Sequence, residues 1–365
     1  MNRLTDTRNP NFAILLICEG QRTEPNFFYC MCNDLSARGI LTCKYTVLPK
    51  SSFEKEDEEV HADRGEKRRL IREIKQGNPA KDAPINLFPG EQPLNWVKAG
   101  LDNLSTYDEV WCVFDKDGHP KQQEAFELVQ HNQASGKNIN IAFSSRSIEY
   151  YFLLHFEYIF EAFEKSECNE KKYSGTKSKT VYFHCMTEKA VEGKACNGEL
   201  CINGYARKKG YWHDTKTNIS LYPLLKDKLL IGVKNSIKLR QESNIKAEHT
   251  PIYERNPYVT VDHLVARLLG YSIIHTPITI NVDGTKILIE QDGECLCFIN
   301  IGDIAYVMPD TSVETHNPID NSRVMLKVER PFLKPGETSR IKIIDIEDDH
   351  LIIMSLGGKN YILDK

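Results

Sequence analysis

Acidic residues follow two apolar runs of the sequence, at positions where a parallel sheet would bring them together. Glu19 directly follows the run 12–18, and Asp115 and Asp117 follow the run 109–114. Continuous apolar runs of this length are typical of strands buried on both faces. Because sites in open parallel sheets form at the carboxyl ends of the strands, we expect these carboxylates to share one edge. Asp115 and Asp117 are two residues apart, so in extended backbone their side chains point the same way.

Carboxylates gathered in this way predict a metal-ion site. Like charges at one edge are costly unless a cation lies between them, and hard oxygen ligands suit Mg²⁺ or Mn²⁺. One or two such ions can activate water, stabilise a leaving oxygen and neutralise a phosphodiester. We therefore interpret Asp115 and Asp117 as candidate metal ligands and Glu19 as a ligand or general base. The alternative is an ordinary strand end, where aspartate hydrogen-bonds the local turn.

The residues after the apolar run 139–143 add a further carboxylate and a cation. Glu149 would reach the same edge of the sheet, although an acid at a helix start is also stabilised by the helix dipole. Arg146 could hold a phosphate through two parallel hydrogen bonds. His119 could protonate a leaving group, but we favour a surface turn histidine there. We interpret His155 as a core or supporting residue of an amphipathic helix.

The elements that must position these residues alternate between strands and helices in the first half of the chain. Apolar runs predict the strands, and capping or amphipathic patterns predict the helices. The expected strands are 12–18, 43–48, 109–114 and 139–143, and the expected helices are 24–37, 94–104, 120–133 and 147–163. This order predicts an α/β fold with an open, mostly parallel sheet and helices on both faces.

Changes of composition divide the chain into three parts. We expect a catalytic α/β domain over residues 1–164, with a charged insertion at about 50–90. Residues 165–271 read as a Lys- and Cys-rich insertion followed by a helical extension. From 272 to 365, short apolar runs alternate with turn signals, which predicts a small all-β domain of sandwich or barrel type.

The overall composition limits the classes of protein that the chain can represent. Its 365 residues carry 47 basic and 51 acidic side chains, so any nucleic-acid contact must come from local patches. No apolar run is long enough to cross a membrane, and the start lacks an apolar signal core, so we expect a cytoplasmic location. Eleven scattered cysteines favour reduced thiols over a disulfide framework.

Two basic patches are candidate contacts for nucleic acid. The patches are Lys67, Arg68, Arg69 and Arg72, and Arg207, Lys208 and Lys209 beside Tyr211 and Trp212. The second patch mixes cations with aromatic rings, which suits stacking on unpaired bases. Solvated surface is the alternative for both.

Cysteines and a histidine in the middle of the chain form a weak zinc pattern. His184 and Cys185 precede Cys196 and Cys201, which are five residues apart. The spacing is loose and lacks a tight Cys-x2-Cys pair, so we favour free thiols and expect no zinc.

The acidic motifs resemble the Toprim domain of topoisomerases, primases and OLD-family nucleases. Toprim domains have a Glu after the first strand and an Asp-x-Asp after the third, which Glu19 and Asp115/Asp117 match. OLD-type members add an acidic residue in the first helix and a Ser-x-Glu after the next strand. Glu24, Ser147 and Glu149 match these positions, so the resemblance implies that they also bind metal, with Ser147 and Glu149 at a second position.

The sequence is still more similar to the RloB-like (AbiL-type) family of bacterial anti-phage defence proteins. The matching pieces are 18–29 (CEGQRTEPNFFY), 113–117 (VFDKD), 147–156 (SIEYYFLLHF) and 256–261 (NPYVTV). The resemblance covers about residues 10–270, with interruptions at 50–90 and 168–215. The part after 272 is not in the usual family core.

The resemblance implies an activity and a partner. Such proteins are expected to be Mg²⁺- or Mn²⁺-dependent nucleases that cut DNA or RNA, with tRNA among the candidate substrates. They pair with an ABC-type or AAA-like ATPase encoded nearby and act in abortive infection. The assembly could be a homo-oligomer or a large hetero-complex. OLD-type sites also use a distal lysine, for which Lys177, Lys179 and Lys234 all stay open.

Two other interpretations are open at this point. The chain could be a non-catalytic Toprim-fold module whose all-β part docks the ATPase or a phage protein. It could also be a phosphatase of the haloacid dehalogenase type, which uses an Asp-x-Asp as well. That family places its aspartate pair after the first strand, so the order in this chain speaks against it.

Overall fold

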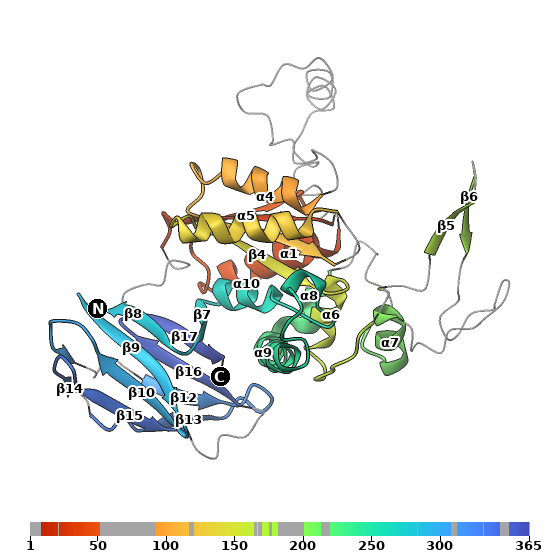
Figure 1. Cartoon of the computed structure of the whole chain (residues 1–365). Coiled ribbons are helices and arrows are strands. Elements are labelled where there is room, and N and C mark those ends of the chain that lie inside the picture. The colour runs from red at the N-terminus through yellow and green to blue at the C-terminus, as the bar shows by residue number, and fades with distance from the viewer. Residues whose placement is uncertain are drawn as a thin grey trace.

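The structure is a computed structural model, and it describes most of the chain. The described residues are 9–20, 22–51, 92–116, 120–163, 166, 170–174, 177–181, 201–212, 220–282, 284–307, 312–330, 332–343 and 350–364. Along the chain, an α/β part comes first, a helical layer follows, and a β sandwich comes last (Figure 1). Within these ranges, no helix is both long and apolar enough to cross a membrane.

Four parallel strands form the sheet of the α/β part. In sheet order they are β2 (Lys44–Leu48), β1 (Ala13–Cys18), β3 (Glu109–Asp115) and β4 (Ile139–Ser144). Every neighbouring pair is parallel. The two central strands, β1 and β3, are almost wholly buried, as their continuous apolar sequences require. The prediction of a parallel sheet in an α/β arrangement is confirmed.

Helices cover both faces of this sheet. α4 (Pro93–Asp102) and α5 (Gln122–Ala134) share one core with the odd-numbered residues of β1. α1 (Thr23–Ala37), α6 (Ile148–Leu153) and α10 (Val261–Leu268) share another core with its even-numbered residues. Since alternate side chains of a strand point to opposite faces, neither face of β1 is left to solvent.

The helix expected over 147–163 was wrong beyond its first turns. α6 ends at Leu153, and residues 157–163 are not helical. Aromatic rings follow at every second residue, a spacing that places them on one side of an extended chain. They pack under lysines of the next helical segment, with Nζ-to-centroid distances of 4.1 Å for Lys228–Phe156, 5.0 Å for Lys238–Tyr158 and 4.2 Å for Lys246–Phe160.

The helical layer lies between the sheet and the sandwich along the chain, and its longest element is α9. Its elements are α7 (Ile202–Lys209), α8 (Tyr222–Leu225), η2 (Lys226–Lys228), α9 (Leu229–Lys246) and η3 (Ile252–Glu254). The hairpin of β5 (Glu170–Ser174) and β6 (Lys177–Val181) precedes them in the chain and stands apart from them (Figure 1). α9 packs against α6 and α10, so it lies behind the helices that cover one face of the sheet.

The last part of the chain is all β, as predicted. One sheet has the order β15-β10-β9-β8, a second has the order β13-β12-β16-β17-β7, and β11 pairs with β14. The bounds are β7 (Tyr271–His275), β8 (Ile278–Val282), β9 (Thr285–Asp292), β10 (Cys295–Asn300), β11 (Tyr306–Val307), β12 (Ser312–His316), β13 (Arg323–Leu326), β14 (Phe332–Leu333), β15 (Thr338–Lys342), β16 (Leu351–Leu356) and β17 (Lys359–Asp364). Apolar residues of both sheets form one core, so the arrangement is a sandwich.

The sandwich is joined to the rest of the molecule through an apolar face. Leu351, Ile353 and Ile362 of the five-stranded sheet belong to the same buried cluster as residues of α9 and α10. β7 follows α10 directly and pairs in parallel with β17. The five-stranded sheet is therefore buried on both faces at this junction, with the helical layer on one side and its partner sheet on the other.

Candidate functional site

The exits of β1 and β3 meet through the carboxylate of Glu19 and the backbone of Asp115. Glu19 Oε2 accepts a hydrogen bond from the backbone N–H of Asp115 at 2.8 Å. The backbone N–H of Glu19 donates to the carbonyl of Val113 at 2.8 Å, which continues the pairing of the two strands by one residue. The parallel register therefore places Glu19 directly beside Asp115 at the carboxyl edge of the sheet.

Glu24 lies at the same exit, in the first turn of α1. Its side chain is buried, and a Cβ atom built on Gly20 would lie only 1.9 Å from Glu24 Oε2. The carboxylate therefore fills the space in front of Gly20, one residue after Glu19. Burial raises the pKa of the nearby Cys18 thiol, and the charges of Glu24 and Asp115 raise it further. The Cys18 thiol is thus neutral in this arrangement.

The exit of β4 supplies the next group of predicted residues. Ser144 is the cross-strand partner of Asp115, and its carbonyl accepts from the N–H of Lys116 at 3.0 Å. Ser147 precedes α6, and Glu149 lies in the first turn of that helix, with both side chains buried. The Ser147 hydroxyl makes no hydrogen bond within the described residues and does not cap α6. A buried hydroxyl of this kind is costly until a ligand satisfies it.

Two cations lie at the end of β3, and only one of them was predicted. Arg146 donates from Nη1 to the carbonyl of Lys116 at 3.3 Å. The Lys116 ammonium donates to the carbonyl of Glu254, and partial burial, together with the charge of Arg146, lowers its pKa. Sequence reasoning missed Lys116, although its position between Asp115 and Asp117 was the available signal.

A short segment of chain supports the loop that carries these residues. Val259 forms an antiparallel bridge with Ser144. The Tyr258 carbonyl accepts from the N–H of Ser145 at 2.8 Å, and the Ser145 hydroxyl accepts from the N–H of Tyr258 at 2.7 Å. The Thr260 hydroxyl accepts from the N–H of Phe143 at 2.9 Å. The 256–261 motif thus lies along β4 as a strand-like support, at the point where the chain turns toward Ser147 and Glu149.

The donor chemistry of this edge fits a hard divalent cation. The described donors are the carboxylates of Glu19, Glu24, Asp115 and Glu149 and the hydroxyl of Ser147, all of them oxygen ligands of the kind that Mg²⁺ and Mn²⁺ prefer. The Ser147 hydroxyl, which has no hydrogen-bond partner in the described part of the chain, and the position of Glu24 over Gly20 fit such a group. In the described ranges, no three His, Cys, Asp or Glu side chains are arranged as a metal site. A site with three such ligands would need a residue outside the described ranges, for which Asp117 is the predicted candidate, or a movement of the described carboxylates.

The basic patch on α7 differs from its prediction in its aromatic half. Arg207, Lys208 and Lys209 form the last turn of α7. Trp212, however, is buried and donates from Nε1 to Asn203 at 2.8 Å, and Tyr211 is stacked on Phe156 with centroids 4.4 Å apart. Trp212 is therefore not open to a base, and Phe156 covers one face of the Tyr211 ring. Within the patch, Lys209 Nζ pairs with Glu157 Oε2 at 3.3 Å.

The other histidine, lysine and cysteine candidates do not gather at one place in the described residues. His155 is a core residue, as predicted, and its Nδ1 is 3.0 Å from the Tyr151 carbonyl. Lys234 lies half-buried on α9, while Lys177 and Lys179 lie on β6. Cys201 is buried and its sulfur accepts from the N–H of Gly204 at the start of α7. Outside the described residues lie Lys67, Arg68, Arg69, Arg72, Asp117, His119, His184, Cys185 and Cys196.

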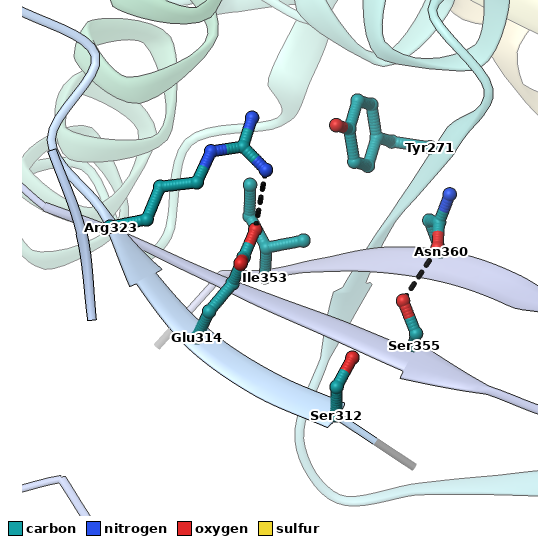
Figure 2. Close-up of a pocket in the computed structure, with 7 residues that line it drawn as sticks. All are labelled: Tyr271, Ser312, Glu314, Arg323, Ile353, Ser355 and Asn360. Carbon is teal, nitrogen blue, oxygen red and sulfur yellow. Dashed lines mark hydrogen bonds and ion pairs between the residues drawn. The ribbon is translucent and has the colours of Figure 1, made fainter. Parts of the chain in front are cut away.

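A polar hollow lies on the β sandwich and is separate from the carboxylate edge. Figure 2 shows its lining side chains pointing to one side of the five-stranded sheet, where they enclose about 230 Å³. Ser355 donates to Asn360 at 2.7 Å, and Arg323 pairs with Glu314 at 2.9 Å. The lining residues are Tyr271, Ser312, Glu314, Arg323, Ile353, Ser355 and Asn360, none of which was predicted as a site residue.

Comparison with known proteins places part of the chain in a family. The family model described as RloB-like protein matches residues 14–268, from β1 to the last residue of α10. The match covers the sheet and the helical layer and ends before β7, so the β sandwich lies outside it. A search of the curated proteins and a search of the solved structures give no match.

Proposed function

The chain belongs to the RloB-like family, and on this premise we propose that it is a metal-dependent nuclease of the Toprim type. It acts on DNA or RNA, with tRNA among the substrates to be tested. It works as the effector of an anti-phage, abortive-infection system, together with an ABC-type ATPase encoded nearby.

The contact between Glu19 and Asp115 is the observation that carries the proposal. It joins the exits of two parallel strands at the edge where open α/β sheets bind ligands. Glu24 is buried one turn away, and Glu149 and Ser147 follow the neighbouring strand β4. Four carboxylates from three strand exits, with a buried hydroxyl lacking a partner in the described residues, are hard to explain as a structural feature alone.

Each residue has a role under this proposal. Glu19, Asp115 and Asp117 would hold a first Mg²⁺ or Mn²⁺ ion, with Glu19 as an alternative general base. Glu24, Ser147 and Glu149 would hold a second ion. When bound, such ions supply an activated water and neutralise the phosphodiester charge.

Arg146 and Lys116 would position the scissile phosphate. Both lie at the end of β3, and the Arg146 guanidinium already contacts the backbone of Lys116. A guanidinium can bind two phosphate oxygens at once, whereas an ammonium acts as a point charge. Desolvation, which lowers the pKa of Lys116, strengthens its attraction to an anion.

A non-catalytic role is the second candidate, and one observation favours it. Ile319, Val324 and Met325 are large apolar side chains that are more than half exposed, on and beside the edge strand β13. Exposed apolar residues at a sheet edge suit protein–protein contact. In this alternative the sandwich docks the ATPase or a phage protein, and the carboxylates are not needed.

The deciding experiment compares Asp115→Ala with Asp102→Ala, an exposed aspartate of α4. Each chain is produced with its ATPase partner and mixed with supercoiled plasmid and total RNA, in Mg²⁺ or in EDTA. We expect metal-dependent cleavage that Asp115→Ala lowers by more than about a hundredfold and Asp102→Ala leaves unchanged. Full cleavage by Asp115→Ala would exclude the nuclease site. Phage defence that survives Asp115→Ala but is lost in Val324→Asp, at an exposed position of β13, would support the docking role.

A further inference from the structure

Three buried charged side chains meet where the β sandwich joins the helical layer. They are Arg240 of α9, Asp262 of α10 and Asp364 of β17, and none is more than 3% exposed. Arg240 Nη1 pairs with Asp262 Oδ1, and Nη2 lies 3.3 Å from Asp364 Oδ2. Gln241 donates to the second oxygen of Asp364 at 3.0 Å. One guanidinium therefore joins two helices to the sandwich.

The same guanidinium also contacts the 256–261 segment, which lies along β4 at the candidate site. Arg240 Nη1 donates to the carbonyl of Val259 at 3.0 Å. Val259 is the residue that bridges to Ser144 at the end of β4, and its neighbours Tyr258 and Thr260 hold Ser145 and Phe143. Three contacts thus lead from the sandwich to the segment that carries Arg146, Ser147 and Glu149: Asp364 to Arg240, Arg240 to Val259, and Val259 to Ser144.

The geometry of arginine limits how this connection can change. A guanidinium is planar and its N–H donors point in fixed directions, so the positions of Asp262, Asp364 and Val259 together determine where it lies. A buried charge that loses a partner is strongly destabilised, which ties the place of Arg240 to that of Asp364. A shift of β17 would therefore move the guanidinium and, through the Val259 carbonyl, the end of β4.

We propose that Arg240 is a positioning residue through which the docked sandwich holds the Ser144–Glu149 loop in its working arrangement. A partner that displaces the sandwich would then change the site without touching it. The proposal rests on the proposed function where it is tested by Mn²⁺ binding and cleavage. Its test by amide hydrogen exchange does not depend on any activity.

A second buried ion pair supplies a matched control. Arg267 of α10 binds Glu109 through Nε and Nη2, with donor–acceptor distances of 3.0 and 2.8 Å. Glu109 is buried and is the first residue of β3, at the end of the strand opposite to Asp115. Glu109→Gln therefore disturbs a comparable pair on the same sheet, away from the carboxylate edge.

The first test measures amide hydrogen exchange of the full chain at Phe143 and Ser145. We expect Asp364→Asn to speed exchange at both amides at least about tenfold, because their acceptors lie on the segment that Arg240 holds. Glu109→Gln should leave both amides unchanged. If Asp364→Asn leaves them protected, or if Glu109→Gln exposes them equally, the positioning role is wrong. Gln241→Ala, which removes only one hydrogen bond to Asp364, gives the same test should Asp364→Asn fail to fold.

The second test follows Mn²⁺ binding through the signal of the free ion, and cleavage with the ATPase partner. We expect Asp364→Asn to weaken Mn²⁺ binding and to lower kcat, each by about tenfold, with KM little changed. Arg240→Lys should show similar losses of Mn²⁺ binding and kcat, since an ammonium cannot make the hydrogen bonds that the guanidinium makes to its several partners. A wild-type chain that neither binds Mn²⁺ nor cleaves would refute the proposed function, while the amide-exchange result would still decide the positioning role.

Discussion

The carboxylate of Glu19 and the backbone of Asp115 are joined by a 2.8 Å hydrogen bond that spans the exits of two parallel strands. The bond has two consequences. It fixes one oxygen of Glu19 beside the start of the Asp-x-Asp motif. It also means that a change at Glu19 affects both the fold and the site, and the two effects can be separated by the choice of substitution.

Glu19→Gln is expected to keep the stability of the fold and to weaken metal binding. The amide oxygen can still accept from the Asp115 N–H, so the thermal midpoint should stay close to that of the wild type. The lost charge should weaken Mn²⁺ binding more than about tenfold. Glu19→Ala loses the hydrogen bond as well and should lower the free energy of unfolding by a further ~1 kcal/mol. Unfolding curves and Mn²⁺ titrations check both variants, and equal stability of the two would contradict the role of the bond.

Gly20→Ala is expected to displace Glu24. The added Cβ would lie 1.9 Å from Glu24 Oε2, and the end of a flexible side chain is the part that must move. We therefore expect weaker metal binding with a small loss of stability, within about 1 kcal/mol. A double-mutant cycle with Glu24→Ala isolates the cause. If Gly20→Ala reduces metal binding as much in the Glu24→Ala background as in the wild type, displacement of Glu24 is not the reason.

His155 is expected to make the protein less stable in mild acid. Burial lowers its pKa to about 4, whereas the unfolded chain binds a proton near pH 6.5. As the pH falls below 6.5, the unfolded state gains a proton that the folded state does not. The free energy of unfolding should then decrease, by up to about 3 kcal/mol near pH 4. Urea unfolding at several pH values measures this.

His155→Leu is the variant that tests this assignment, and His131→Gln, on the exposed face of α5, is the control. Leucine does not titrate, so the free energy of unfolding of His155→Leu should decrease less than that of the wild type as the pH falls. A difference that stays constant from pH 7.5 to 5 would show that His155 is not the group responsible. His131→Gln should follow the wild type throughout.

The sheet and the carboxylate edge could be predicted because their signals are local. Continuous apolar runs mark the buried strands, and the residue after each run must lie at the carboxyl edge. The long helix after Ser147 was wrong because apolar residues at helical spacing hid the two-residue alternation of Phe156, Tyr158 and Phe160. Tyr211 and Trp212 looked available for bases because the sequence does not reveal which rings pack inside.

The junction between the sandwich and the site could not be predicted. Arg240 and Asp364 are 124 residues apart, and neither has a spacing or motif that points to the other. Buried ion pairs arise from tertiary packing, which a single sequence does not encode in a periodic pattern. The family match ends before β7, so the resemblance gave no guide to this junction either.

The parallel pairing of β7 with β17 has a consequence for the order of events during synthesis. β7 is the first strand of the sandwich and β17 the last, so the five-stranded sheet cannot close until the whole sandwich has left the ribosome. Contacts between distant parts of a chain form slowly, and N-terminal parts fold first. Arg240 and Asp262 can therefore pair before Asp364 exists. A nascent chain would carry a folded sheet while the segment at the end of β4 still lacked its link to the sandwich, so the proposed site would be completed only late in production.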